Sequence, residues 1–193
     1  MEAYWLFATI WFVAAATPGA DTMLLLTTSL STGWKSAIPI SLGIIAAKVI
    51  LLTLTYFGLT ALIGASPLIL IALKVFGCGF LLWRAYKLWN TKTAVSTASK
   101  AGFKQNLSLA FSVAVTNPQA LLFYIAVVPQ VSGSTNPWVL NLIIAVGFSL
   151  ISAFYIGLAA PIGTWMTRTD RQKALNRGVA TVFVALAATF ALR

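Results

Sequence analysis

Two residues of opposite charge, Asp21 and Lys48, lie inside long apolar stretches of the sequence. A lone charge is costly inside a membrane, and the chain has only three acidic residues in all. The two residues lie at a similar expected depth, about ten residues from the same end of neighbouring apolar segments, so a salt bridge or a shared proton is allowed. Two interpretations stay open: a static ion pair that neutralises both charges, or a pair that substrate or a proton opens.

Asp21 ends a stretch, Thr17-Pro18-Gly19-Ala20-Asp21, that is expected to interrupt a helix. Pro18 removes a backbone N–H and clashes with the preceding turn, and Gly19 loosens the backbone. A similar stretch, Thr116-Asn117-Pro118-Gln119, follows about one hundred residues later and carries two side-chain amides. Two facing breaks would leave unpaired backbone groups that a polar cavity or a ligand must satisfy. The alternative is that both prolines only kink helices for packing.

A zwitterion would suit such a cavity. Freed N–H groups at the start of a half-helix favour a carboxylate, and freed carbonyls or Asp21 favour an ammonium group. Asp21 is therefore the candidate acceptor of a proton or an ammonium group, Lys48 is its counter-ion, and two amides orient the substrate. The whole candidate site for substrate or proton binding comprises Pro18, Gly19, Asp21, Lys48, Thr116, Asn117, Pro118 and Gln119.

The composition predicts where these residues lie. The chain of 193 residues is 60% hydrophobic and only 8% charged, with a mean hydropathy of +0.91. Such values are typical of an integral membrane protein and not of a soluble domain. The net charge of +10 comes from basic residues that cluster between apolar runs, which indicates membrane topology and not a nucleic-acid-binding face. We expect a lipid bilayer and a small-molecule substrate as partners, and no nucleic acid.

The residue types also exclude several kinds of chemistry. The chain has no histidine, and its three acidic residues cannot form an obvious metal cage. Its single cysteine, Cys78, excludes an intrachain disulfide and a thiolate cluster. A Gly-x-Ser-x-Gly motif and a phosphate-binding glycine loop are both missing from the sequence. We therefore expect no metal, no cofactor and no enzymatic activity.

Hydropathy, with glycine, proline and charged residues as boundaries, predicts an all-α membrane protein with six transmembrane helices. The two halves match at Pro18 and Pro118, and three spans in each half would insert them in opposite senses, as in the inverted repeats of many transporters. We expect one transmembrane domain over residues 1–193, with broken helices 1 and 4. It divides into a first repeat of about 1–90, a polar cytoplasmic linker at 91–104 and a second repeat of about 105–193. The predicted spans are roughly 4–30, 37–64, 67–90, 105–129, 137–166 and 175–192.

The basic residues predict the orientation. In a six-span protein most of the lysines and arginines fall on one face, against Arg193 on the other, so that face is expected to be cytoplasmic and both termini are expected outside. The basic residues of that face are Lys35, Arg84, Lys87, Lys92, Lys100, Lys104, Arg168, Arg171, Lys173 and Arg177. The tryptophans lie mostly near predicted span ends and are interpreted as interface anchors, namely Trp5, Trp11, Trp34, Trp83, Trp89, Trp138 and Trp165.

The chain resembles the LysE/RhtB family of bacterial amino-acid exporters over nearly its full length. The first break stands where the family pattern reads P-G-P-N, and Asn117-Pro118-Gln119-Ala120 is close to the family's N-P-K-A. The other similar segments are Leu42-Gly43, Pro129-Gln130, residues 74–83 with their Leu-Leu-Trp end, and Asn176-Arg177-Gly178. The resemblance implies export of amino acids or their derivatives from the cytoplasm, driven by the proton gradient, across a bacterial inner membrane with both termini periplasmic. Transport would work by rocking of the two inverted halves about the site, that is, by alternating access.

This sequence departs from the family pattern at its charged residues. Asp21 replaces the asparagine of P-G-P-N, and the position of Lys48 often holds an acidic or neutral residue in the family. These look like compensating changes, which favours their pairing. A lysine in the cavity would repel basic amino acids, so we expect neutral substrates such as threonine, homoserine or branched-chain residues. A channel for ions or small solutes is the alternative, a membrane enzyme or assembly subunit is a third, and exposed small-residue faces allow a homodimer.

Overall fold

The computed structural model describes residues 1–17, 19–65, 67–90, 102–157 and 159, together with 177–178, 180–181, 184–185 and 187–188. Within these residues every regular element is a helix, which confirms the all-α fold class. The elements are α1 (Glu2–Ala16), α2 (Ala20–Thr32), α3 (Trp34–Ala65), α4 (Pro67–Asn90), α5 (Phe103–Val115), α6 (Pro118–Val131), the short 3₁₀ helix η1 (Ser132–Ser134) and α7 (Pro137–Gly157). More than half of the sixth predicted span, the end of the fifth and most of the linker lie outside the described residues.

Two of these helices can cross a membrane unaided. The Trp34–Gly58 part of α3 and the whole of α7 are long and apolar enough to span a bilayer. Two further pairs meet the same test only when taken together, because each half-helix alone is too short to span a bilayer. The helices α1 and α2 meet at a bend of 51°, and α5 and α6 meet at a bend of 57°. The described residues therefore hold two spans, or up to four if each bent pair is one span. The predicted number of six spans stays a prediction.

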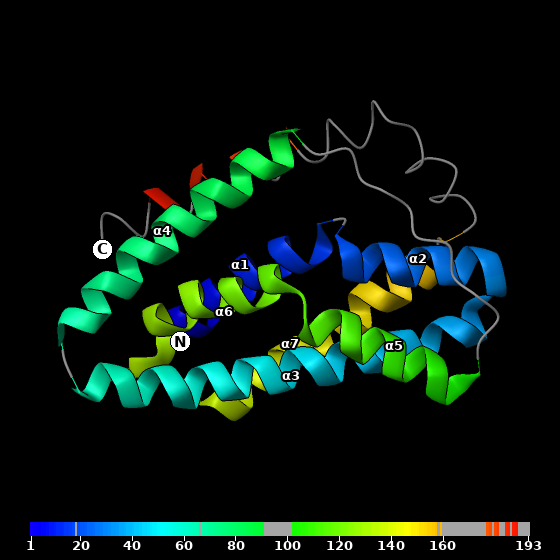
Figure 1. Cartoon of the computed structure of the whole chain (residues 1–193), viewed down its shortest axis with the longest axis horizontal. Coiled ribbons are helices and arrows are strands. Elements are labelled where there is room, and N and C mark those ends of the chain that lie inside the picture. Colours follow the sequence, from blue (N-terminus) through cyan, green and yellow to red (C-terminus); the bar gives the residue numbers. More distant parts are fainter. Residues whose placement is uncertain are drawn as a thin grey trace.

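Both bends lie at a proline in the sequence, near the middle of the molecule (Figure 1). Thr17 has φ −68° and ψ 132°, and Asn117 has φ −69° and ψ 106°, so both are extended. A residue that precedes proline is disfavoured in the helical region, which explains why neither residue continues its helix. Pro118 then begins α6, at a position where the missing N–H costs no intrahelical hydrogen bond.

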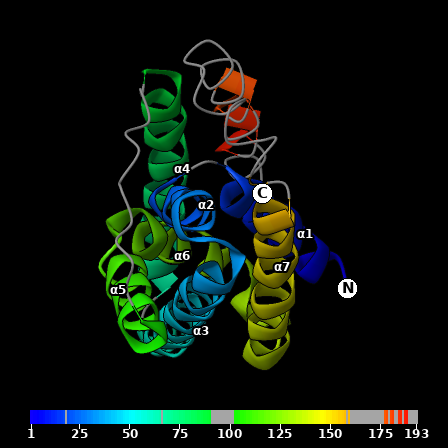
Figure 2. The same cartoon turned by 90° about the vertical axis from the view of Figure 1, so that its right-hand side faces the viewer.

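The helix α3 packs against α2, α5, α6 and α7. It runs along the lower edge of the molecule in Figure 1 and lies between α5 and α7 in Figure 2. It runs antiparallel to α7, because the Ser41 hydroxyl donates to that of Ser152 at 2.7 Å and the Asn141 amide donates to the Thr53 hydroxyl at 2.9 Å. The helix α4 lies along one side and packs mainly on α6. Hydrogen bonds between side chains thus join the two unbroken spans at two levels.

Two glycines let the half-helices that precede the bends approach the unbroken spans. A Cβ atom on Gly43 of α3 would lie 2.4 Å from the Leu107 carbonyl oxygen of α5. A Cβ atom on Gly147 of α7 would lie 2.6 Å from the Trp11 ring of α1. Both distances are shorter than a van der Waals contact, so only glycine fits at either position without a shift. The helix α5 thus packs closely on α3, and α1 on α7.

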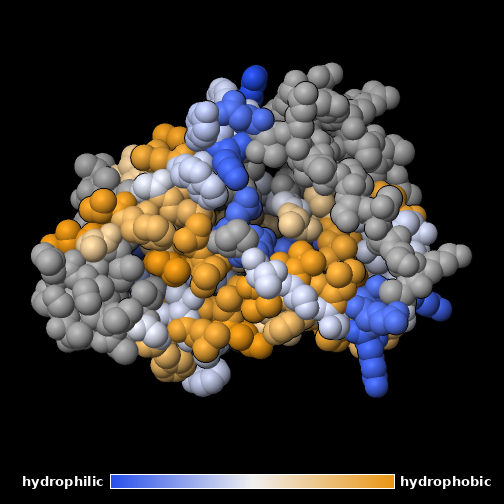
Figure 3. All heavy atoms as spheres, viewed as in Figure 1, coloured by the Kyte–Doolittle hydropathy of each residue, from blue (hydrophilic) through white to orange (hydrophobic). Residues whose placement is uncertain are grey.

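The outer surface is rich in large apolar side chains, and Figure 3 shows them over much of one face. Leu54 of α3, Leu142 and Leu150 of α7, and Val75 of α4 each expose more than half of their area. In water such a surface would be unfavourable, whereas lipid accommodates it. The surface therefore agrees with the apolar lengths of the helices.

Candidate functional site

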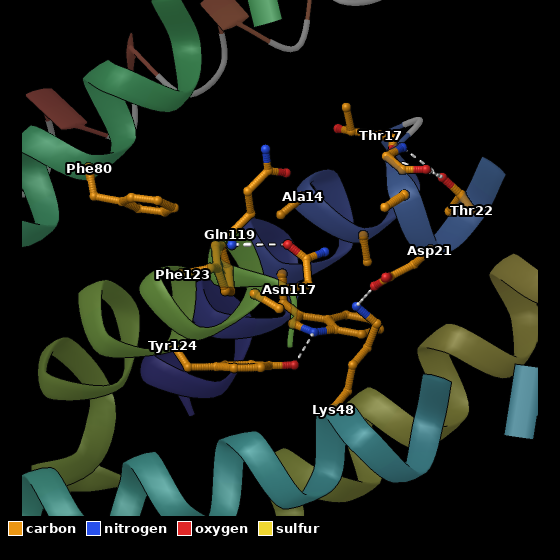
Figure 4. A pocket seen from close by; sticks show the side chains of 15 residues that line it. Ala14, Thr17, Asp21, Thr22, Lys48, Phe80, Asn117, Gln119, Phe123 and Tyr124 are labelled. Atoms are coloured by element: carbon orange, nitrogen blue, oxygen red, sulfur yellow. Dashed lines mark hydrogen bonds and ion pairs between the residues drawn. The ribbon is translucent and has the colours of Figure 1, made fainter. Parts of the chain in front are cut away.

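The two helix breaks meet at one cavity with a volume of about 70 Å³, which is room for several water molecules (Figure 4). Five predicted site residues line it: Gly19, Asp21, Lys48, Asn117 and Gln119. The full lining comprises Trp11, Ala14, Ala15, Thr17, Gly19, Ala20, Asp21, Thr22, Lys48, Phe80, Asn117, Gln119, Ala120, Phe123 and Tyr124.

Of the three remaining predicted residues, only Thr116 has a described side chain, and it does not line this cavity. Thr116 is exposed, and its hydroxyl donates to the backbone carbonyl of Ser112 at 2.6 Å. Pro118 contributes the first residue of α6, but its side chain lies outside the described part of the chain. Pro18 also lies outside the described residues. The described lining at each break comes from residues on both sides of the proline in the sequence, Thr17 and Gly19 at the first break and Asn117 and Gln119 at the second.

Asp21 and Lys48 form the ion pair that their sequence positions allowed. The Lys48 ammonium donates to Oδ2 of Asp21 at 2.6 Å, and both residues are buried. The second carboxylate oxygen, Oδ1, is buried and has no hydrogen-bond partner among the described residues. The ring of Phe148 from α7 lies 5.2 Å from the Lys48 ammonium, close enough for a cation–π contact. One carboxylate oxygen thus holds the lysine, while the other is a buried acceptor without a hydrogen-bond partner among the described residues.

The N-terminus of α2 points at this cavity. Gly19 is the N-cap, its N–H donates to the Thr22 hydroxyl at 2.8 Å, and Asp21 lies in the first turn. The partial positive charge at a helix N-terminus favours the carboxylate of Asp21 there. The first N–H groups of the helix have no carbonyl partner within it, so they are available to an anion.

The N-terminus of α6 reaches the same cavity from the second half of the chain. Asn117 is its N-cap, and the Asn117 side-chain oxygen accepts a hydrogen bond from the Gln119 N–H at 3.0 Å. This leaves the Asn117 amide NH₂ and the Gln119 side chain to face the cavity, as Figure 4 shows. Two helix N-termini and one lysine therefore surround a single carboxylate, an arrangement that favours a bound carboxylate in addition to an ammonium group.

The opposite wall of the cavity is apolar and aromatic. It comprises Ala14 and Ala15 of α1, Phe80 of α4, and Ala120 and Phe123 of α6. In Figure 4, Phe80 and Phe123 lie on one side, and Asp21 and Lys48 on the other. The cavity can thus hold a molecule with charged groups at one end and an apolar group at the other.

Trp11 and Tyr124 complete the cavity, and the sequence did not point to either as a site residue. The Trp11 ring N–H donates to the Tyr124 hydroxyl at 3.3 Å, and both side chains are almost fully buried. The predicted role of Trp11 as an interface anchor is wrong, because an anchor must reach the headgroup region and this ring is enclosed by protein. Its place inside the first span, less than two turns before Thr17, is the signal that would have indicated a buried role.

Tyr155 is a further residue at the first break that sequence reasoning missed. Its hydroxyl donates at 3.0 Å to the carbonyl oxygen of Ala16, the last residue of α1. That carbonyl has lost its helical partner because α1 ends there. A side chain from α7 therefore satisfies part of the backbone that the break exposes.

The described residues contain no group of three or more His, Cys, Asp or Glu side chains that could hold a metal ion. The polar groups at the cavity are instead one carboxylate, one ammonium group, amides and hydroxyls. Such groups can bind and exchange a charged organic ligand or a proton.

Comparison with known proteins identifies the family of the chain. The model of the LysE type translocator family matches residues 12–193. A leucine efflux protein of Enterobacter sp. (strain 638) is 28% identical, with 97% of this chain and 94% of the relative covered. A leucine efflux protein of Klebsiella pneumoniae is also 28% identical, with 90% and 87% covered. A homoserine/homoserine lactone efflux protein of Salmonella typhimurium is 26% identical, with 90% and 88% covered.

No solved structure gives a significant match to the chain. The family match covers nearly the whole sequence, including both helix breaks and all the described cavity residues except Trp11. The chain belongs to the LysE type translocator family, a family of transport proteins and not of enzymes.

Proposed function

We propose that the chain exports neutral amino acids from the cytoplasm across a bacterial inner membrane, in exchange for protons and by alternating access. The observation that carries this proposal is the cavity where the two breaks meet, with a buried carboxylate oxygen that has no partner among the described residues. The names of the relatives, which are efflux proteins for leucine and for homoserine and its lactone, support the direction and the class of substrate.

An amino-acid zwitterion complements the cavity at both of its charged groups. Its ammonium group would donate to Oδ1 of Asp21, the free acceptor. Its carboxylate would lie against the Lys48 ammonium and the N-termini of α2 and α6. The side chain would then extend toward the apolar wall that contains Phe80 and Phe123.

Charge balance favours a neutral amino acid over a basic one. Asp21 and Lys48 together carry no net charge, so a zwitterion leaves the buried site neutral. Lysine or arginine would add one positive charge beside the buried ammonium group of Lys48. An uncompensated charge in such surroundings is strongly unfavourable.

Asp21 also offers a simple means of proton coupling. Its free oxygen can accept either an ammonium group or a proton, but not both at once. If Asp21 takes up a proton after substrate leaves toward the periplasm and gives it up in the cytoplasm, substrate and proton move in opposite directions. While Asp21 is protonated, the Phe148 ring beside the Lys48 ammonium offers that cation a partner.

The packing of the helices supports alternating access by two inverted repeats. The unbroken spans α3 and α7 run antiparallel, as equivalent helices of two inverted halves must. In addition, α5 packs closely on α3 at Gly43, and α1 packs closely on α7 at Gly147. We propose that these two groups rock against each other about the cavity, within a six-span domain whose termini are periplasmic.

Counter-flow in proteoliposomes tests the proposal. Vesicles that contain the purified chain are loaded with unlabelled amino acid, and uptake of radiolabelled leucine, threonine, homoserine and lysine is measured with and without an imposed proton gradient. We expect saturable uptake of the neutral amino acids that responds to the gradient, and much slower uptake of lysine. Faster transport of lysine than of threonine would contradict the substrate class. Unsaturated, voltage-driven current would indicate a channel instead.

A further inference from the structure

Trp11 lies between the cavity and helix α7, where it contacts a residue that does not line the site. One edge of its ring faces Gly147, where a Cβ atom would lie 2.6 Å from Cζ3 and 3.3 Å from Cη2. The nitrogen at the other edge of the ring donates to the Tyr124 hydroxyl at 3.3 Å. Trp11 and Tyr124 both line the cavity. The ring is thus fixed between α7 on one side and α6 on the other.

The absence of a side chain at position 147 determines how far the ring can withdraw from the cavity. Carbon atoms pack at about 3.5–4.0 Å, so a methyl group at this position would force the ring or α7 to move by about 1 Å. Tryptophan has a rigid ring and little freedom to yield when it is almost fully buried. The direction away from α7 leads toward Tyr124 and the cavity.

We propose that Gly147, by seating Trp11 against α7, sets the size of the amino-acid side chain that the cavity accepts. This inference rests on the proposed function, since it concerns the space that the same substrate would occupy in the cavity. With glycine at position 147 the ring withdraws, and the cavity accepts a side chain as large as that of leucine. With a larger residue there, Trp11 would occupy part of that space, and only smaller amino acids would fit. Gly147 is then a positioning residue that acts through Trp11.

The test compares Gly147→Ala with a matched variant on the same helix. Gly157 is exposed, and a Cβ atom there would meet no atom of the described residues within 4 Å, so Gly157→Ala makes the same change to α7 without touching the cavity. The KM values for leucine and alanine are measured for both variants in proteoliposomes. We expect Gly147→Ala to raise the KM of leucine about tenfold or more relative to that of alanine, and Gly157→Ala to leave the ratio unchanged.

A second variant should reverse the effect, and it also provides a test that does not require Gly147→Ala to fold. Trp11→Phe removes part of the ring, so in the Gly147→Ala background it should return the ratio of the two KM values toward that of the unchanged chain. In the unchanged chain, Trp11→Phe should lower the KM of phenylalanine relative to that of leucine. If Gly147→Ala fails to yield a monodisperse protein, Trp11→Phe alone provides the test. An unchanged ratio of the KM of phenylalanine to the KM of leucine in that variant would overturn the inference.

The inference and the proposed function fail in different ways. If the unchanged chain transports no amino acid, the proposed function is wrong, and the size inference falls with it. If it transports leucine and alanine, but Gly147→Ala and Gly157→Ala give the same ratio of KM values, only the inference about Gly147 is wrong.

Discussion

The two helix breaks are built alike but carry different chemistry. In each, a threonine follows the end of a half-helix, and its hydroxyl donates at 2.6 Å to the carbonyl four residues earlier, from Thr17 to Val13 and from Thr116 to Ser112. Each threonine is closely followed by a proline in the sequence. The bends that result, 51° and 57°, are nearly equal. Proline and threonine are therefore enough to produce the backbone of both breaks.

The difference lies in the residues that follow. The first break presents Asp21, which pairs with Lys48, whereas the second presents the neutral amides of Asn117 and Gln119. The Asn117 oxygen caps α6, so it is not available to a ligand, while Asp21 keeps one oxygen free. A buried charge needs a nearby partner of opposite sign, and α3 supplies one only to the first break. The first break can thus bind and exchange charge, and the second positions a ligand.

The largest effect is expected from removing one charge of the first break. Asp21→Asn or Lys48→Met leaves the other charge buried and unpaired, a loss of about 3–5 kcal/mol in stability. Either variant should also abolish export, because one end of the zwitterion loses its partner. Thermal unfolding in detergent and counter-flow in vesicles measure the two effects. The charge-swapped double variant, Asp21→Lys with Lys48→Asp, should be more stable than either single variant, and if it is not, the pairing has no energetic role.

A neutral double variant separates the two interpretations of the pair. Asp21→Asn together with Lys48→Met removes both charges and should recover most of the stability that either single change loses. If the pair only neutralises itself, transport recovers as well. If the pair binds substrate and proton, the double variant is stable but inactive, which is the result we expect.

The next largest effect concerns the packing that holds α5, the half-helix before the second break. Gly43→Ala would bring a methyl group to 2.4 Å from the Leu107 carbonyl oxygen, which belongs to the backbone and cannot rotate away. We expect a loss of about 1–3 kcal/mol in stability, as for other overpacked sites. Gly58→Ala, on the same helix with no atom within 4 Å of the added Cβ, is the matched control and should not destabilise. Equal melting temperatures for the two variants would show that α3 and α5 separate at little cost.

The charged part of the site was predictable because membrane sequences make charge informative. Asp21 and Lys48 interrupt apolar runs at similar depths, which allowed their pairing, and their departures from the family pattern favoured it. Asn117 and Gln119 were found because a proline marks the break beside them. The aromatic residues Trp11 and Tyr124 gave no such signal, since an aromatic residue in an apolar helix can face lipid, the interface or the core.

The fold, like the site, was predictable only in part from the sequence. Apolar length and proline position predicted α3, α7 and the two interruptions, and the structure has them. What the sequence could not provide is which helices touch, because an apolar helix has no polar face that shows its orientation. Tyr155 illustrates this limit: its bond to the Ala16 carbonyl joins residues far apart in the chain, and only the packing of α7 on α1 reveals it.

A smaller effect is expected from removing the cap of the second break. Asn117→Ala removes the oxygen that accepts from the Gln119 N–H, and loss of an N-cap costs about 1 kcal/mol. Asn117→Ser retains a capping oxygen and should restore most of that stability. If the second break only positions the ligand, Asn117→Ser should export with a raised KM but a nearly unchanged kcat. A complete loss of export in the serine variant would place the Asn117 amide in the essential chemistry, and the contrast between the two breaks would disappear.

The smallest effect compares the two threonines directly. Thr17→Val and Thr116→Val make the same nearly isosteric change and remove equivalent hydrogen bonds of equal length. Thr17 is only 3% exposed and lines the cavity, whereas Thr116 is exposed, so the two sites differ in surroundings and not in local geometry. We expect Thr17→Val to cost about 1 kcal/mol in stability. Its export should also slow, because the bend that places Asp21 relaxes when the hydroxyl no longer bonds the preceding turn. Thr116→Val should cost only a few tenths of the stability that Thr17→Val loses, and it should leave export unchanged. If both variants lost export equally, the two breaks would contribute equally to transport.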